Sequence, residues 1–333
     1  MAANPKLPVE PDDMKPIHVY HAEAHVLSGS LKHPIEQPIP QQALVVLGKT
    51  QLDGHIMQSV EGTTLEGLIS FKAGHSRASG SKIAKKDLWG NDHSGWVTLS
   101  TSVIEGLNVF EVITADRVVA QVSTEHAENA NHKDKRPDHV PRVTFLGTRF
   151  ENLRVGGYPV QVELDLDICG NKPENDQPYL QDRGFLNRVQ RQLEGIAGAK
   201  GLPESLEQAY DSKIAYIDDL KKRANGGAKG QRNGYSKLQC SLVKSIGPIP
   251  IPGVRTFGNI IFIPDFGTVS LAEVEVGIEA GNDGSADQTG SGSSQKPGYS
   301  NYFALDMLNM HLGCIGGGTV KAGSAKSNGE TNP

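Results

Sequence analysis

Apolar and polar residues alternate in many stretches of this chain, and turn-forming residues bound each stretch. From Tyr20 to Val26 the even-numbered positions are apolar, whereas histidine and glutamate occupy the odd-numbered ones. A period of two is typical of a strand with one buried face. The 38 glycines and 19 prolines among 333 residues exceed the average share and agree with many turns. The pattern therefore predicts a chain built mainly from strands.

Further strands are expected where Val, Ile, Thr or aromatic residues cluster between turn signals. These stretches are residues 43–47, 64–71, 95–103, 118–123, 142–145, 158–166, 238–243, 259–263 and 269–276. Strands and helices do not alternate regularly, which favours an antiparallel arrangement. We predict a mainly β fold: an antiparallel β-sandwich-like body with an inserted α-helical hairpin.

The hairpin is predicted between Asp182 and Asn225, where the apolar period lengthens to three or four residues, as on one face of a helix. The apolar positions are Leu186, Val189, Leu193 and Ile196 in the first helix, and Leu206, Tyr210, Ile214, Ile217 and Leu220 in the second. Soluble monomers rarely leave such stripes uncovered. Two alternatives follow for Tyr210, Ile214 and Ile217: burial within the chain, or contact with a partner protein.

These elements suggest how the chain is organised. We expect residues 17–170 and 235–323 to form the sandwich together, with residues 171–234 as the inserted hairpin. Four prolines in residues 1–16 predict a disordered lead. The polar residues 324–333 predict a disordered tail.

Charge and hydropathy exclude several classes of partner. The formal net charge is −5 and no long basic run occurs, which argues against nucleic acid or an anionic membrane as the main partner. No apolar stretch approaches the roughly 20 residues of a membrane span. The N-terminus has no apolar stretch of signal-peptide length, so the chain as written is expected to be cytoplasmic.

His21, Glu23 and His25 form the most suggestive group for chemistry. Residues two apart on a strand share a face, so these three side chains are expected to project together. Two imidazoles and a carboxylate are a ligand set suited to zinc or iron. The alternative is a polar face that contacts only solvent. Apart from zinc or iron here, and calcium at a second group described next, no cofactor is predicted.

Glu163, Asp165 and Asp167 repeat this spacing with carboxylates, which suit calcium or acid–base catalysis of glycoside hydrolysis. A solvated strand face is the alternative. The cysteines, Cys169, Cys240 and Cys314, are far apart in sequence. Their spacing excludes a zinc knuckle and is compatible with a Cys240–Cys314 disulfide or with three buried thiols.

Four segments carry a resemblance to a known family. Residues 102–107 are followed by 113–120, and residues 263–273 are followed by 304–312. These segments resemble the choice-of-anchor P family of bacterial surface-type β modules. The resemblance implies a β fold and an extracellular location, and it supplies no catalytic residues. The hairpin at 182–225 departs from the family pattern.

The sequence therefore suggests a non-enzymatic structural or adhesive β module that binds a protein partner or self-associates. The alternative is a metal-dependent or carbohydrate-active enzyme that uses His21, Glu23 and His25, and carbohydrate remains a candidate ligand.

Overall fold

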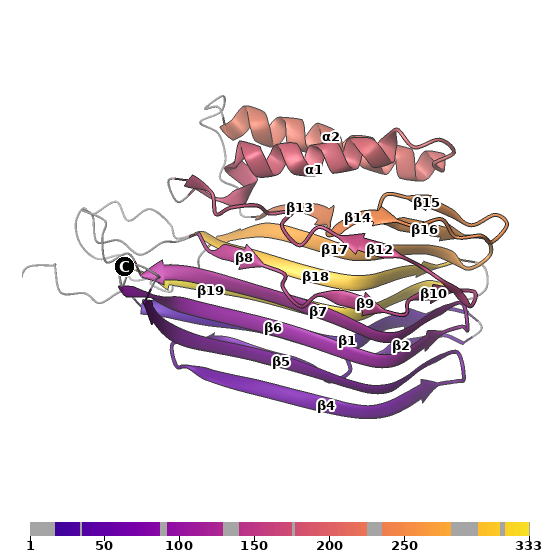
Figure 1. The fold of residues 1–333 in the computed structure, drawn as a ribbon, viewed down its shortest axis with the longest axis horizontal. Helices are drawn as coiled ribbons and strands as arrows, with labels where there is room; N and C mark the ends of the chain where they lie inside the picture. Colours follow the sequence, from indigo (N-terminus) through magenta and orange to yellow (C-terminus); the bar gives the residue numbers. More distant parts are fainter. Residues whose placement is uncertain are drawn as a thin grey trace, which may run out of the picture.

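Two antiparallel sheets pack face to face in this protein, and a helical hairpin lies along one side of them (Figure 1). The computed structural model describes residues 17–33, 35–86, 92–128, 140–174, 177–224, 235–280, 299–313 and 317–332. The lead predicted for residues 1–16 lies outside these ranges. The described residues are mainly antiparallel β with two helices, which confirms the predicted fold class.

The larger sheet, sheet A, contains strands from both ends of the described chain. They are β1 (Ile17–Leu31), β2 (Gln37–Ile39), β3 (Val45–Thr50), β13 (Tyr235–Ser241), β15 (Arg255–Phe257), β16 (Ile260–Ile263), β17 (Gly267–Ala280), β18 (Tyr299–Leu312) and β19 (Gly318–Asn332). Their order is β15-β16-β17-β18-β19-β1-β2, with β13 beside β17 and β3 beside β1. β1 and β19 are therefore direct neighbours although they are far apart in sequence.

The second sheet, sheet B, comes from one continuous part of the chain. It contains β4 (Gly54–Leu65), β5 (Ile69–Lys86), β6 (Asp92–Val109), β7 (Ile113–Glu128), β8 (Arg142–Thr144), β9 (Arg149–Glu151), β10 (Arg154–Val155) and β11 (Tyr158–Pro159). Its order is β11-β10-β7-β6-β5-β4, with β8 and β9 beside β7. A small third sheet pairs β12 (Val162–Leu164) with β14 (Val243–Ile246).

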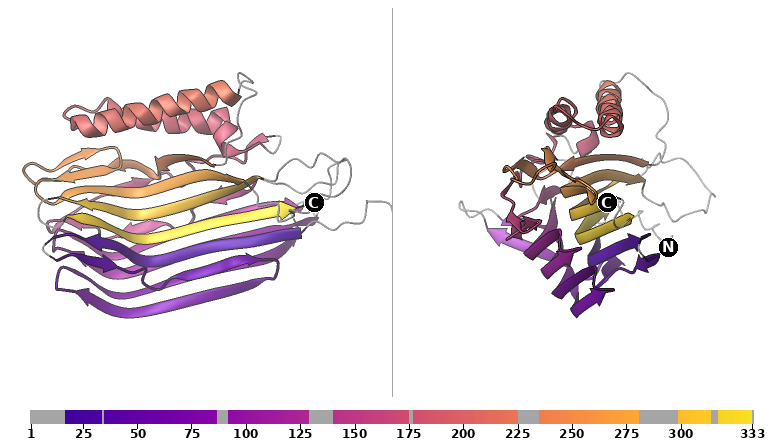
Figure 2. Two further views of the ribbon diagram at one scale, coloured as in Figure 1. Left: turned by 180° about the vertical axis from the view of Figure 1, so that it is seen from behind. Right: turned by 90° about the vertical axis from the view of Figure 1, so that its right-hand side faces the viewer.

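The two sheets form a wedge, which the end-on view in Figure 2 (right) shows. A large apolar cluster fills the wide part and includes residues of both sheets and both helices, such as Phe145, Phe185 and Phe303. A separate, smaller cluster occupies the narrow part: Tyr20, Ala22, Ala24, Val45, Leu47, Ala78 and Trp96. Alanines make up three of its seven members, so little side-chain volume separates the sheets there.

Glycines of β5 bring the sheets into close contact on this narrow side. A Cβ atom at Gly74 would lie 2.6 Å from a methyl carbon of Val26, and one at Gly80 would lie 2.4 Å from the Tyr20 ring. Val26 and Tyr20 belong to β1 of the opposite sheet. Any larger residue at these two positions would push the sheets apart, because side chains of the facing strand already fill the space.

Serine hydroxyls join the two sheets at the same place. Ser100 on β6 donates a hydrogen bond to the carbonyl oxygen of Glu23 (2.5 Å), and Ser102 donates one to that of His25 (2.8 Å). Both serines are fully buried. Since a buried hydroxyl without a partner is costly, these bonds explain how polar side chains are tolerated between the sheets.

The long strands change their buried face at one common level. In β17 the change falls at Ala272 (φ 46°) and in β19 at Gly323 (φ 70°), whereas in β1 the consecutive residues Val26 and Leu27 are both buried. The cross-strand register is unchanged on either side, so the bends are aligned across sheet A. Sheet B has the same feature at Gly106 (φ 62°). Apolar residues thus continue to face the core along strands of 14 to 18 residues.

The helical hairpin is confirmed as α1 (Arg183–Ala197) and α2 (Glu204–Ala224), preceded by the short helix η3 (Tyr179–Gln181). Asp182 caps α1, because its carboxylate accepts a hydrogen bond from the Phe185 backbone N–H (2.6 Å). Gln192 fixes α1 to β13: its amide donates to the Ser241 carbonyl oxygen (2.8 Å) and accepts from the Ser241 N–H (2.9 Å). Acidic residues begin α2 and basic residues end it, as the helix dipole favours.

The apolar stripe of α2 is covered by the rest of the chain. Tyr210 is 5% exposed and Ile217 is fully buried, and half-buried Ile214 packs against the same core. The structure thus places the three residues proposed for partner binding according to the first alternative, burial within the chain. The physical reason is that α1 and the wide side of the wedge together offer a matching apolar surface.

Two sequence-based expectations were wrong. Residues 324–333 were predicted to be a disordered tail, but β19 continues to Asn332 and pairs with β1 and β18. Residues 64–71 were predicted to be one strand, but they contain a turn at Glu66 and Gly67, both at positive φ, between β4 and β5. In β19 small and polar residues pack where the sheets are close, so hydrophobicity did not reveal the strand. At residues 64–71 apolar residues continue on both sides of the two-residue turn, so hydrophobicity did not reveal the turn.

Substitution of Gly80 tests the close approach of the sheets. We expect Gly80→Ala to lower the free energy of unfolding by about 1–3 kcal/mol, because the new methyl group would overlap the Tyr20 ring. Gly48→Ala on β3 is the matched control, since no heavy atom lies within 4 Å of its added Cβ. Urea denaturation of both variants measures the difference, and equal stabilities would contradict the proposed contact.

Substitution of Ile217 tests internal burial of the hairpin. We expect Ile217→Ala to lower the free energy of unfolding by about 2–4 kcal/mol, since it leaves a cavity in the core. Ile214→Ala, at a half-buried position, should cost clearly less. Thermal melting and light scattering are to be measured together. An unchanged melting temperature with loss of a bound partner would instead support the partner-binding alternative.

Candidate functional site

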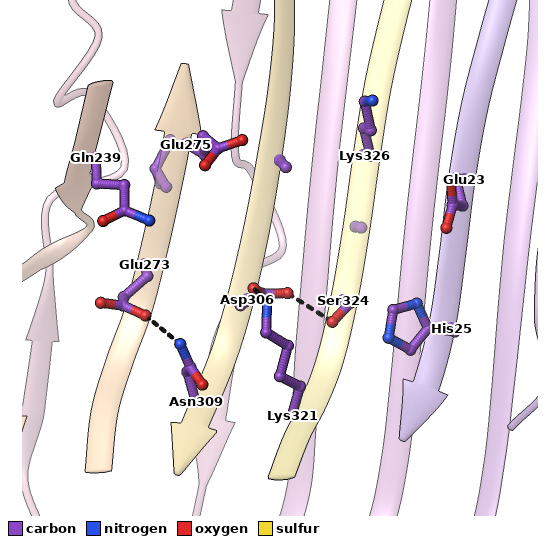
Figure 3. A pocket seen from close by; sticks show the side chains of 13 residues that line it. Glu23, His25, Gln239, Glu273, Glu275, Asp306, Asn309, Lys321, Ser324 and Lys326 are labelled. Atoms are coloured by element: carbon purple, nitrogen blue, oxygen red, sulfur yellow. Dashed lines mark hydrogen bonds and ion pairs between the residues drawn. The ribbon is translucent and has the colours of Figure 1, made fainter. Parts of the chain in front are cut away.

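A polar pocket lies on the face of sheet A that is turned away from sheet B (Figure 3). Its volume is about 210 Å³. The side chains that line it come from five neighbouring strands: Gln239 on β13, Glu273 and Glu275 on β17, Ala304, Asp306 and Asn309 on β18, Lys321, Ser324 and Lys326 on β19, and Glu23 and His25 on β1. We call this group the sheet A pocket.

The strand register aligns four of these residues in one row. Glu273 is paired with Asp306, Asp306 with Ser324, and Ser324 with His25. Directly opposed residues on one face lie close enough to interact, so the row forms a continuous polar line across β17, β18, β19 and β1. A second row, one step along the strands, joins Glu275 to Glu23 through Ala304 and Lys326.

Hydrogen bonds hold the carboxylates of the first row in place. The Asn309 amide donates to Glu273 (2.8 Å), and the Ser324 hydroxyl donates to Asp306 (2.6 Å). The Lys321 ammonium also contacts Asp306 (2.6 Å). Burial alone would lower the pKa of Lys321, but the Asp306 carboxylate outweighs this effect and raises it. Lys321 therefore stays charged and partly neutralises the acids, which would otherwise repel each other.

Glu275 in the second row is also hydrogen-bonded. Its carboxylate accepts a bond from the Tyr302 hydroxyl (2.8 Å) and forms an ion pair with Lys237 (2.9 Å). The Tyr302 ring lies across Gly277, where an added Cβ would come within 2.2 Å of it. The Lys326 ammonium lies 4.5 Å from the centre of the same ring. The absence of a side chain at Gly277 thus leaves room for the Tyr302 ring, whose hydroxyl holds the Glu275 carboxylate in place.

His21, Glu23 and His25 share the outer face of β1, as the alternation predicted, but they do not form a metal site in the described residues. No group of three His, Cys, Asp or Glu side chains converges in that part of the chain. Glu23 and His25 line the sheet A pocket, whereas His21 does not. Three residues spaced along a straight strand are too far apart for one ion with bonds near ~2 Å.

His25 interacts with neighbours in its own part of the sheet. Its Nε2 atom lies 2.9 Å from the Ser28 hydroxyl, and its Nδ1 atom lies 3.4 Å from the Gln41 amide nitrogen. Burial lowers the pKa of His25, although the Asp306 and Glu23 carboxylates oppose this effect. The imidazole is therefore neutral at pH 7 and serves as a hydrogen-bonding group in the pocket wall.

The carboxylates proposed for calcium or glycoside hydrolysis are not brought together. Glu163 is on β12 and is ion-paired with Lys244 (2.6 Å), which lowers the pKa of the Glu163 carboxyl. Asp165 follows the end of β12, and Asp167 lies in the next turn. The predicted common strand face therefore does not exist, because the strand ends at Leu164.

The described cysteines are buried thiols. Cys169 and Cys240 are both free, so the proposed Cys240–Cys314 disulfide is not formed, and Cys314 itself lies outside the described residues. Burial raises the pKa of Cys240 to about 12, which leaves the thiol protonated and unreactive. No helix in the described part of the chain is long and apolar enough to cross a membrane.

A buried histidine pair lies between the sheets, at the end where β1 begins. His18 is 3% exposed and His126 is fully buried, and their ring centroids are 4.8 Å apart. The His18 ring also stacks on Trp96, with centroids 5.2 Å apart and planes at 11°. Burial lowers the pKa of His18 to about 4. His18 shares the even-numbered, buried face of Tyr20 and Ala22, so the alternation of this strand could have indicated that His18 is buried.

Sequence reasoning also missed most of the sheet A pocket. Glu273 and Glu275 were visible as polar positions between apolar ones, but nothing linked them to Asp306, Ser324 or His25. That link depends on which strands are neighbours, and the order of strands in a sheet is a tertiary property.

The fold and the pocket define a mainly antiparallel β protein with two large packed sheets, a polar pocket and a helical insertion. The chain belongs to the family described as a domain of unknown function, DUF8256, whose model matches residues 18–277. No curated protein and no solved structure matches this chain. β18 and β19 follow the matched range, yet they connect β17 to β1 within sheet A.

The pKa of His18 predicts acid sensitivity. Between about pH 6.5 and pH 4 the unfolded chain takes up a proton that the folded His18 does not, so stability falls by up to about 3 kcal/mol as the pH decreases. His25 acts in the same direction. In His18→Gln the slope of stability against pH should be shallower, whereas exposed His33→Gln should behave as the wild type does. Identical slopes in His18→Gln and wild type would contradict this prediction.

Proposed function

We propose that this protein is a non-enzymatic β module that binds a protein partner, and that the sheet A pocket receives a positively charged segment of that partner. The observation that carries the proposal is the row Glu273–Asp306–Ser324–His25, whose side chains are held by hydrogen bonds and by backbone register. Side chains that are already ordered lose little entropy on binding.

The charge balance of the pocket favours a cationic partner. Its carboxylates are Glu23, Glu273, Glu275 and Asp306, and its ammonium groups are Lys321 and Lys326. With His25 neutral, two negative charges remain in excess. An excess of one sign in a pocket raises the local concentration of oppositely charged groups and guides their approach.

The size of the pocket favours a side chain over a complete small molecule. A volume of about 210 Å³ lies below the roughly 300–1,000 Å³ that is usual for sites of drug-sized ligands. One or two lysine or arginine side chains, presented by a larger partner, match this space and the carboxylates that line it.

A bacterial surface location is the second part of this proposal. Its support is the resemblance of residues 102–107, 113–120, 263–273 and 304–312 to the choice-of-anchor P family. In the structure these residues contribute to β6, β7, β17 and β18, the long strands of the two sheets. A module of this kind would display the outer face of sheet A to a partner.

The different-class alternative is an enzyme that uses His21, Glu23 and His25. Hydrogen bonds with Ser28 and Gln41 engage both ring nitrogens of His25: Nδ1 accepts from the Gln41 amide, and Nε2 of the neutral ring donates to the Ser28 hydroxyl. A metal ligand must leave one ring nitrogen for the ion, so this arrangement favours the binding module.

A labelled hexalysine peptide tests the proposal directly, with hexaglutamate as the control peptide and fluorescence anisotropy as the measurement. We expect hexalysine to bind and the double variant Glu273→Gln/Glu275→Gln to bind it about tenfold more weakly, since two charges at up to about 1 kcal/mol each are removed. Glu125→Gln is the matched control variant, because Glu125 lies on β7 of sheet B, on the face turned away from sheet A, and it should bind the peptide as wild type does. Raising the salt concentration should weaken binding.

Three results would contradict the proposal. Equal binding of both peptides would show that charge is not recognised. Equal affinity of the double variant and Glu125→Gln would place the site elsewhere. Stoichiometric zinc or iron in the purified protein, lost in His21→Ala, would support the enzyme alternative.

A further inference from the structure

Strand β4 forms one edge of sheet B. It pairs with β5 in an unbroken register from Gly54↔Gly80 to Glu61↔Ala73, and no other described strand pairs with it. The backbone N–H and C=O groups along its outer side are therefore available for pairing with another strand.

The sequence of β4 has none of the features that usually protect such an edge. In its twelve residues, GHIMQSVEGTTL, Glu61 is the one carboxylate and His55 the one imidazole, and no lysine, arginine or proline occurs. The regular register leaves no bulge between Gly54 and Glu61. Natural proteins normally place charges, prolines or bulges at exposed edges to prevent association, so their absence here indicates an edge that is used.

Exposed apolar side chains concentrate at the same edge. Ile56 is 42% exposed and Met57 is 62% exposed. Leu52 in the connection to β4 is also exposed, so three of the seven large exposed apolar residues in the described chain lie here. Ile56 is opposite Ala78, whose side chain is buried in the narrow cluster. The Ile56 side chain therefore lies on the core-facing side of sheet B. Because β4 is the last strand of the described sheet, no further strand of this sheet covers it.

We propose that β4 pairs with β4 of a second copy of this chain, antiparallel and with the two-fold axis at Gln58, so that the two B sheets become one. In this register His55 faces Glu61 of the second copy, and Ile56 faces Val60. Met57 faces Ser59 on the outer side. Each contact occurs twice, as a two-fold interface requires.

Complementarity of polar and of apolar side chains selects this register. Paired residues lie on the same face of the sheet, so the axis can shift by one residue at a time. An axis at Met57 would place Ile56 opposite Gln58, and an axis at Ser59 would place Ile56 opposite Gly62. Both shifts separate His55 from Glu61. Only the Gln58 axis places the His55 imidazole opposite the Glu61 carboxylate, to which it can hydrogen-bond, and also places Ile56 opposite Val60.

This interface does not depend on the sheet A pocket. β4 belongs to sheet B, whereas the pocket lies on the outer face of sheet A. A dimer would carry two pockets, which strengthens attachment to any partner with repeated sites.

Sedimentation velocity of the full chain tests the dimer, and a concentration series up to the order of 100 µM covers weak association. We expect a reversible dimer in the wild type. His55→Glu places two acids opposite Glu61 residues and should weaken the dimer at least about tenfold. The double variant His55→Glu/Glu61→Lys places opposite charges across the interface and should dimerise again. All these positions are exposed, so melting temperatures should stay close to that of the wild type.

Cysteine cross-linking tests the register. Gln58→Cys meets its own copy at the axis and should form a covalent dimer under mild oxidation. Thr64→Cys is the matched control, because in this register its two copies are ~40 Å apart and should not cross-link. A wild type that stays monomeric throughout the series would overturn the proposal. So would a dimer unaffected by His55→Glu, or equal cross-linking at residues 58 and 64.

Discussion

The close contact between sheet A and sheet B along β1 is the constraint on which the rest of the structure depends. It exists because Gly74 and Gly80 leave space for Val26 and Tyr20, and because Ser100 and its neighbour Ser102 bond to the backbone of β1. With the sheets held together on one side, they must diverge on the other. On that wide side the apolar side chains of the two sheets are covered by the helical hairpin.

The same constraint positions the sheet A pocket. β1 is fixed from one face by sheet B, and β19 pairs with it along nearly its whole length. Small residues such as Ala322 and Ala325 let β19 lie in this narrow region. The outer face of these strands is consequently a firm support, on which Ser324 and His25 meet Asp306 in one row. Backbone register and core packing thus fix the positions of the side chains that line the pocket.

The fold leaves two surfaces with separate physical characters. The sheet A pocket is polar, hydrogen-bonded and acidic, and it suits recognition of a charged segment. The β4 edge offers unpaired backbone groups beside Ile56 and Met57, and it suits association with a like strand. Because they lie on different sheets, one surface can be occupied while the other is altered.

The sequence by itself determined the elements whose burial involves bulky apolar residues. The stripe that ends at Leu193 and Ile196 predicts α1, and the alternation from Val269 to Val276 predicts β17, because both patterns follow from local periodicity. The same stretch contains the change of face at Ala272, visible as a shift from odd to even apolar positions.

Only the tertiary structure decided where small and polar residues form strands, and which side chains meet. β5 and β19 consist largely of Gly, Ala, Ser and Lys, so a hydrophobic pattern does not predict them as strands. These strands are stabilised by pairing with strands on both sides and by the close packing of the two sheets. His25, Ser324 and Asp306 come together because β1, β19 and β18 are neighbours. Neighbour relations between distant strands follow from the packing of the whole core, which no local pattern contains.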